Sequence, residues 1–324
     1  MNLRLAILAL SDKYGLSDDS RERLRQLAGL DQPPPSLAER MPLGSAILGA
    51  ALGGLGVLFW IAANWASLPA WGRFALLEGA LVCMLLGAWH RPGARVALSL
   101  LGLLICGGLL ACIGQTYQTG ADPWQLFALW AALAFPLCEG LRHDVLWTAW
   151  TIVALTAALL LSQVHAAGWW DSGNSPLLSS LGSWMPALAL AFAYRFVPKR
   201  YTGTDLWPMR LCMIYATIGL AWTALLSMFV HNGQGVYPLT LITIVCLAYG
   251  FSLPNIFDVF VFSALGLSAN VIVVSGLAKL LLGPGSGDLI GAMVVIGGTA
   301  AAMLAGTVKL LLHLIHRNAE ALSS

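Results

Sequence analysis

The sequence predicts an all-α, polytopic membrane helix bundle of about ten transmembrane helices, preceded by a short cytoplasmic helical hairpin. Of the 324 residues, 58% are hydrophobic and only 10% are charged, whereas soluble domains carry about 25% charged residues. Charge is concentrated at the start, where the first 40 positions hold 12 of the 32 Asp, Glu, Lys and Arg residues. A polar head on a long apolar body excludes an ordinary soluble enzyme. The balanced charge of the head also argues against a nucleic-acid partner.

The first 40 residues are predicted to form the helical hairpin. Residues 1–10 are apolar but contain Arg4 and are not followed by a small-residue cleavage site, unlike a signal peptide. The Ser-Asp-Asp cluster at 17–19 suits a helix N-terminus, and the proline run at 33–35 would end that helix. The hairpin would rest on the membrane surface or on the loops of the body. A loosely ordered polar tail is the alternative, and the sequence does not decide whether the head docks.

From Met41 onward, apolar stretches alternate with clusters of Pro, Gly and charged residues. A helix needs about 20 residues to cross the hydrocarbon core of a bilayer. Stretches near this length are predicted as spans at residues 41–63, 71–89, 96–113, 124–140, 145–164, 178–196, 211–230, 237–253, 256–281 and 289–312. The eighth span is short, and residues 252–255 could instead be a break within a longer element. The bundle would cover residues 41–317, with a cytoplasmic tail at 318–324.

The positions of lysine and arginine support this count and orient the chain. Basic residues in short loops mark the cytoplasmic side of a membrane protein. With both termini in the cytoplasm, 15 of the 17 Lys and Arg residues fall inside, and only Arg73 and Lys279 fall outside. Omission of one early helix would invert every later loop, so ten helices with cytoplasmic termini are predicted.

Metal, disulfide and common catalytic motifs are not found in the sequence. The six cysteines lie inside predicted spans without a C-x-x-C pair, and the six histidines are dispersed, although His165 and His231 could meet in space. The chain has no H-E-x-x-H, G-x-S-x-G or G-x-x-x-x-G-K-[S/T] motif. We therefore predict no catalytic residue, metal or cofactor, and an enzyme is the third of three functional hypotheses.

Polar and aromatic residues gather in two predicted outer connections. One runs from Asn64 to Arg73 and the other covers residues 114–124, while a third, longer connection is predicted at 165–176. Short loops join the first four spans, so the first two connections should lie close together at the outer face. Arg73 would there bind an anion or pair with Asp122. The predicted outward-facing polar pocket comprises Asn64, Trp65, Arg73, Gln115, Tyr117 and Asp122.

Each of these residues also has a simpler interpretation. Trp65 lies where an interfacial aromatic belt places tryptophan. Asp122 before Pro123 has the form of an N-cap followed by proline at the first helical position. Arg73 at a helix start can extend to the lipid headgroups.

Glu78 is the ionisable residue placed deepest inside a predicted span. A charged side chain at the bilayer centre costs about 2.5–3.5 kcal/mol on insertion scales, and Glu78 has no basic residue one turn away in either direction. We expect it to face the bundle interior, protonated or hydrogen-bonded to Asn64 or Gln115, which makes it a candidate coupling residue. Asp258 is expected to be a first-turn acid behind an N-cap at Asn255.

Paired glycines occur in three predicted spans, at 53–54, 107–108 and 297–298. They are predicted to permit close helix packing. The alternative is that they are pivots for helix movement in a transporter built from two inverted sets of five helices. No sequence repeat supports that division.

Two segments resemble the signature segments of a known family. Residues 53–73 (GGLGVLFWIAANWASLPAWGR) and 114–136 (GQTYQTGADPWQLFALWAALAFP) resemble those of the bacterial predicted inner-membrane proteins grouped as the 2157 domain-of-unknown-function family. The resemblance covers about residues 1–150. It implies the fold class and the bacterial inner membrane, and carries no activity or catalytic residue. It marks the six predicted pocket residues as the first to test.

Two hypotheses of different class follow. The first is a transporter or flippase-like carrier for a small or amphiphilic solute, embedded in membrane lipid. The second is a non-catalytic membrane scaffold or sensor that partners an envelope protein complex. A continuous polar cavity reaching Glu78 would favour the carrier, and a solid body with a flat aromatic outer face would favour the scaffold.

Overall fold

A computed structural model describes residues 13–15, 17, 19–20, 22–23, 35–117, 120, 122–170, 176–197, 203, 206–229, 235–254, 256–282 and 289–323. Residues 35–40, 165–170, 176–180 and 319–323 are described by their backbone alone. The hairpin predicted for the first 40 residues lies mostly outside these ranges.

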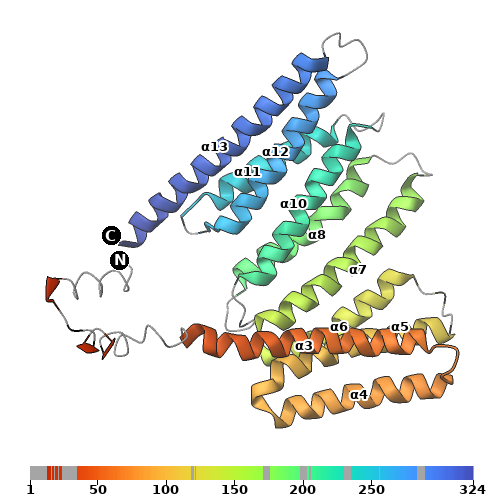
Figure 1. The fold of residues 1–324 in the computed structure, drawn as a ribbon. Coiled ribbons are helices and arrows are strands. Elements are labelled where there is room, and N and C mark those ends of the chain that lie inside the picture. Colours follow the sequence, from red (N-terminus) through yellow and green to blue (C-terminus); the bar gives the residue numbers. More distant parts are fainter. Residues whose placement is uncertain are drawn as a thin grey trace.

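Ten long helices in the described ranges match the ten predicted spans in order (Figure 1). They are α3 (Pro35–Ala63), α4 (Ala70–His90), α5 (Arg95–Tyr117), α6 (Pro123–Leu141), α7 (Asp144–Trp170), α8 (Pro176–Phe196), α10 (Trp207–Ser227), α11 (Val236–Phe251), α12 (Val259–Leu281) and α13 (Leu289–Ser323). A short 3-10 turn, η1 (Pro92–Ala94), joins α4 to α5. No strand occurs in the described part of the chain. Eight of the helices are long and apolar enough to cross a membrane, and α11 is a shorter apolar helix. The predicted all-α, polytopic class is confirmed.

Three helices extend at least six residues beyond the predicted spans. Pro35, the last residue of the proline run, is the first residue of α3, as suits proline at the first helical position. α7 continues to Trp170, which shortens the outer connection expected at 165–176. α13 continues through the predicted tail to Ser323. Hydropathy marks only the membrane-spanning part of a helix, and residues that favour helix, such as the Ala-Glu-Ala-Leu run near the end of α13, extend it further.

The connection between α11 and α12 is a break in the chain's helical path. Asp258 has an extended backbone (φ −135°, ψ 117°), and its side chain accepts hydrogen bonds from the N–H groups of Phe260 and Val261. Asp258 is therefore the N-cap of α12, and its expected role as a first-turn acid is wrong. Asn255, the expected cap, lies outside the described residues.

The helices pack around two central elements. α5 contacts α3, α4, α6 and α7, while α10 contacts α7, α8, α11 and α12. α7 borders both groups, and the hydrogen bond between the Thr151 and Tyr194 hydroxyls (2.7 Å) links α7 to α8. α4 packs mainly on α5, and α13 mainly on α12. These two helices lie at opposite edges of the bundle in Figure 1.

Two adjacent glycines bring neighbouring helices close to α5. A Cβ atom at Gly107 would lie 2.4 Å from the ring of Trp130 on α6, and one at Gly108 would lie 2.0 Å from Leu58 on α3. The indole N–H of Trp130 donates to the carbonyl of Leu103, one turn before Gly107 (2.9 Å). The glycine pair therefore allows both α3 and α6 to reach the α5 backbone, which confirms the predicted packing role at this site.

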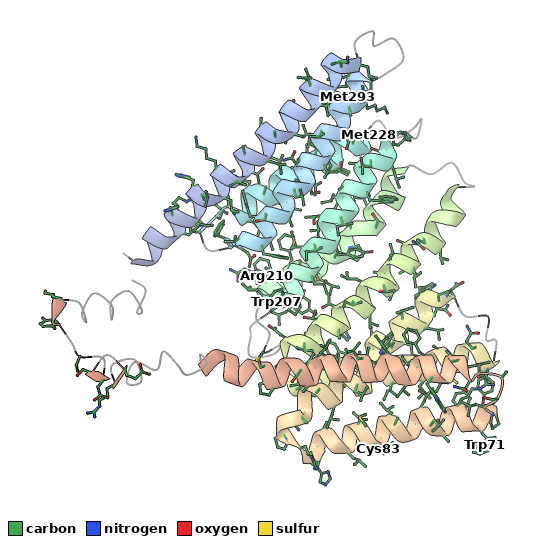
Figure 2. The ribbon with its side chains drawn as sticks, in the orientation of Figure 1. Trp71, Cys83, Trp207, Arg210, Met228 and Met293 are labelled. Atoms are coloured by element: carbon green, nitrogen blue, oxygen red, sulfur yellow. The ribbon has the colours of Figure 1, made fainter. Side chains whose placement is uncertain are left out.

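A buried ion pair ties α10 to α12. Arg210 Nε lies 3.0 Å from Asp258 Oδ2, and its Nη2 lies 2.9 Å from the same oxygen. The Asp258 side chain is only 3% exposed and that of Arg210 is 25% exposed. The rings of Trp207 and Phe260 flank the guanidinium at 5.2 and 5.8 Å, and Figure 2 shows Trp207 beside Arg210 at one end of α10. The carboxylate thus serves two purposes, as a helix cap and as the partner of an enclosed arginine.

Candidate functional site

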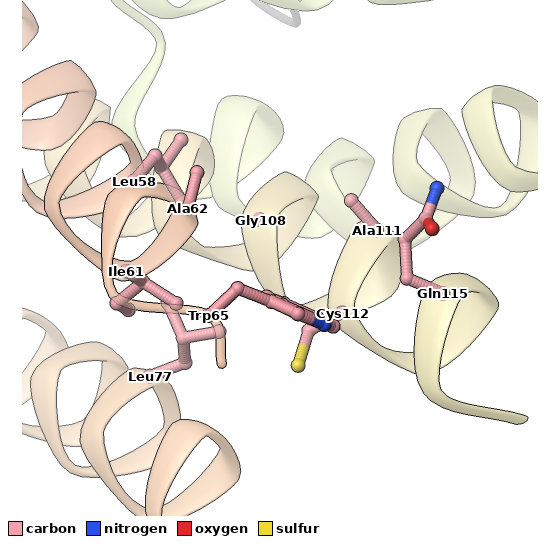
Figure 3. A pocket seen from close by; sticks show the side chains of 9 residues that line it. All are labelled: Leu58, Ile61, Ala62, Trp65, Leu77, Gly108, Ala111, Cys112 and Gln115. Atoms are coloured by element: carbon pink, nitrogen blue, oxygen red, sulfur yellow. The ribbon is translucent and has the colours of Figure 1, made fainter. Parts of the chain in front are cut away.

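A cavity of about 400 Å³ lies between α3, α4 and α5 (Figure 3). This volume is within the range of small-molecule binding sites, which is about 300–1,000 Å³. Hydrocarbon dominates its walls, and the side-chain amide of Gln115 is the most polar group among them. The lining residues are Leu58, Ile61, Ala62, Trp65, Leu77, Gly108, Ala111, Cys112 and Gln115.

The cavity arises from the arrangement of the three helices and from small side chains. α3 and α4 each pack on α5. Ala62, Gly108 and Ala111 lie at this junction and leave space that larger side chains would fill. The lining residues of α3 and α5 belong to the last turns of these helices. The cavity therefore lies toward the end of the bundle that carries the α3–α4 and α5–α6 connections.

Arg73 organises the α3–α4 connection beside this cavity. Its Nε donates to the carbonyl of Leu68 (3.0 Å), and its Nη2 donates to the carbonyl of Trp65 (2.7 Å). The guanidinium carbon lies 3.7 Å from the centre of the Trp65 ring, a close cation–π stack. Since Trp65 also lines the cavity, Arg73 holds one of its walls in position.

The predicted pairing of Arg73 with Asp122 is not formed. In the described part of the chain, no hydrogen bond or ion pair joins Arg73 to Gln115, Tyr117 or Asp122. The reason is local: the carbonyl groups of the α3–α4 connection lie within reach of the guanidinium and receive its donors.

The other three predicted pocket residues do not line the cavity. The Asn64 amide donates to the carbonyl of Trp60 in the last turn of α3 (2.9 Å). Tyr117 stacks on Phe74 of α4 with ring centres 6.0 Å apart. Asp122 is exposed at the N-cap position of α6, where its side chain makes no capping hydrogen bond. Of the six predicted residues, Trp65 and Gln115 line the cavity and Arg73 stacks on its wall.

Glu78 does not face the bundle interior. It is exposed, whereas its neighbour Leu77 is buried and lines the cavity. α4 is an edge helix that packs mainly on α5, so its buried face is narrow and Glu78 falls outside it. The expected buried interior position is therefore wrong, and the coupling role stays a prediction.

Most cavity residues could not be found from sequence. Leu58, Ile61 and Leu77 are apolar residues in apolar spans, and no local pattern distinguishes a residue beside a cavity from one in packed contact or in lipid. The signal that was present is the 107–108 glycine pair, because Leu58 of α3 lies against Gly108 and both residues line the cavity.

Comparison with known proteins shows one similarity, to a family model that covers the part of the chain containing the cavity. No curated protein and no solved structure matches the chain. Residues 9–147, which include α3 to α6 and every residue that lines the cavity, match the family described as Predicted membrane protein (DUF2157), so the resemblance seen in the sequence is confirmed.

Proposed function

We propose that this protein is a carrier for an amphiphilic molecule and that the α3–α4–α5 cavity receives the apolar part of that molecule. The observation that supports this proposal is the cavity itself, a space of about 400 Å³ walled by hydrocarbon with a single carboxamide, Gln115, on its lining. Apolar walls with few polar groups are typical of sites that bury a ligand's apolar surface and orient it by a small number of hydrogen bonds. A small polar solute would leave most of this lining without a partner.

The helix arrangement is compatible with the movement that a carrier needs. A carrier exposes its site alternately to the two sides of the membrane, usually by movement of one helix group against another. Here one group packs around α5 and holds the cavity, and the other packs around α10 and holds the Arg210–Asp258 pair. α7 borders both groups, so we place the moving boundary along α7.

We further propose that the protein lies in the bacterial inner membrane with both termini in the cytoplasm and with the cavity end outside. The support is the 15-to-2 distribution of lysine and arginine. Two exposed positions at opposite ends of α4, Ala66 and Gly93, provide a matched test.

For a cysteine introduced at each position in a cysteine-free background, an impermeant maleimide should label Ala66→Cys in spheroplasts and Gly93→Cys only after permeabilisation. Gly93 suits this use because a Cβ atom there meets nothing within 4 Å. The reverse labelling pattern would show that the orientation is inverted.

Filling the cavity should abolish amphiphile binding. Ala111 is exposed and lines the cavity, so Ala111→Phe can occupy the space without disturbing a packed core. If the phenyl ring displaces two ligand methylene groups, the loss is about 1.6 kcal/mol at about 0.8 kcal/mol each, which is more than tenfold in affinity. The matched control is Ala132→Phe, at an exposed position of α6 that does not line the cavity.

The readout is protection of an introduced thiol, Ala62→Cys, from maleimide in lipid nanodiscs. Ala62 is exposed and lines the cavity, so a bound chain should shield it. The ligands are dodecanol, dodecanoate, dodecyl phosphate and dodecyltrimethylammonium. Protection by at least one of them, lost in Ala111→Phe and kept in Ala132→Phe, is the expected result. Absence of protection by all four would remove the carrier proposal and favour the scaffold.

A further inference from the structure

We infer that the amphiphile is anionic and that Arg73 binds its headgroup while the chain occupies the cavity. This inference rests on the proposed function and adds the chemical class of the ligand. Three observations carry it: the unused donors of Arg73, its uncompensated charge, and its contact with the cavity wall.

Arg73 is held in place but keeps most of its hydrogen-bonding capacity. A guanidinium has five N–H donors in a planar fork. Two bonds, to the carbonyls of Trp65 and Leu68, fix its position. The remaining donors have no partner in the described part of the chain, so the side chain is prepared to receive an acceptor group without reorganising.

The charge of Arg73 is also unpaired within the described residues. Neither the Arg23–Asp19 pair nor the Arg210–Asp258 pair involves Arg73. Unlike Arg210, which is neutralised by an enclosed carboxylate, Arg73 has only neutral carbonyls and an aromatic ring as contacts. A half-buried guanidinium with free donors favours a carboxylate or phosphate, to which it makes charge-assisted and frequently bidentate hydrogen bonds.

Trp65 joins this cationic position to the apolar cavity. The guanidinium carbon lies 3.7 Å from the centre of the Trp65 ring, and the same residue lines the cavity. A chain that packs along Trp65 would therefore have its headgroup near Arg73 and within the neighbourhood of the Gln115 amide. One site would then satisfy both parts of an anionic amphiphile.

The headgroup series of the thiol-protection assay tests this inference in the unmodified binding site. In phosphatidylcholine nanodiscs, dodecanoate and dodecyl phosphate should protect Ala62→Cys at concentrations at least tenfold lower than dodecanol, and dodecyltrimethylammonium should be weakest. Equal protection by all four ligands would overturn the headgroup assignment and leave the carrier proposal intact. No protection by any ligand would instead remove the carrier proposal, so the two failures are distinct.

Variants at position 73 then identify the responsible residue. Arg73→Gln should remove the preference for anions over dodecanol measured within the same variant, whereas Arg73→Lys should retain part of that preference because it keeps the charge. The control is Arg91→Gln, at the exposed opposite end of α4, which should keep the full preference. Retention of the preference in a folded Arg73→Gln variant would overturn the role of Arg73. If that variant fails to fold, the headgroup series and Arg73→Lys still decide the question.

The source of the ligand is distinguished by the composition of the nanodisc. If phosphatidylglycerol discs alone protect Ala62→Cys, and Arg73→Gln removes that protection, the anionic amphiphile is a membrane lipid. If protection requires added dodecanoate or dodecyl phosphate, the ligand is a free single-chain amphiphile. Either result supports the inference, and Arg73-independent protection by phosphatidylglycerol contradicts it.

Discussion

Replacement of Asp258 by alanine is expected to lower the free energy of unfolding by about 3–5 kcal/mol, the usual effect of breaking a buried ion pair. The substitution leaves Arg210, whose side chain is 25% exposed, without its anion between Trp207 and Phe260. It also removes the acceptor for the first N–H groups of α12. The measurement is denaturant or thermal unfolding of the purified protein in detergent micelles.

Two further variants separate these contributions. Asp258→Asn keeps a side-chain oxygen that can cap α12 but removes the charge, so its cost reports the ion pair. The double variant Arg210→Met/Asp258→Ala should lose less stability than the sum of the losses of the two single variants. Each single variant leaves one charged side chain without its partner, whereas the double variant leaves none. If Asp258→Ala has the stability of the unmodified protein, the pair does not hold α10 and α12 together.

Substitution of Gly107 by valine is expected to destabilise the bundle by about 2–4 kcal/mol, from overpacking and a lost hydrogen bond. A Cβ atom at this position would lie 2.4 Å from the Trp130 ring. The ring cannot yield without breaking the indole hydrogen bond to the Leu103 carbonyl (2.9 Å). Thermal unfolding in micelles measures the loss.

The matched control is Gly53→Val on α3, where an added Cβ meets nothing within 4 Å. This variant should stay within about 0.5 kcal/mol of the unmodified protein, as substitutions away from packed contacts usually do. Trp130→Leu in the Gly107→Val background should recover part of the loss because it removes the clashing ring. Equal stability of the two glycine variants would show that α5 and α6 do not pack as closely as described.

The two glycine positions also show where sequence reasoning ends. Gly53, Gly107 and Gly297 each belong to a glycine pair in an apolar span, and the same packing role was predicted for all three pairs. In the structure a Cβ atom at Gly107 would meet the Trp130 ring, and one at Gly54 would meet Leu101 and Leu104 of α5. Gly53 and both glycines of the 297–298 pair have open space at the Cβ position. A glycine permits a close approach, but only the neighbouring helix determines whether the approach occurs.

Some features of the candidate site could likewise be predicted from the sequence, and others could not. The sequence singled out Trp65, Arg73 and Gln115, because polar and aromatic residues at the ends of apolar spans are visible without a fold. It placed Gln115 in a connection, whereas α5 continues to Tyr117. It could not predict that the Arg73 donors go to backbone carbonyls, since a carbonyl acceptor is present in every residue. It also placed Glu78 on the wrong side of α4, because hydropathy gives a span's depth and not the direction in which each side chain points.

The sequence by itself determined the ten helices, their order and the apolar class of the protein, because the thickness of the hydrocarbon layer imposes a length that each span must satisfy locally. Only the tertiary structure decided which faces meet. Arg210 and Asp258 are 48 residues apart and form a buried pair, and the cavity is lined by three helices whose apolar residues look alike in sequence. Lipid and protein interiors are both apolar, so composition cannot distinguish a lipid-facing surface from a packed one or from the wall of a cavity.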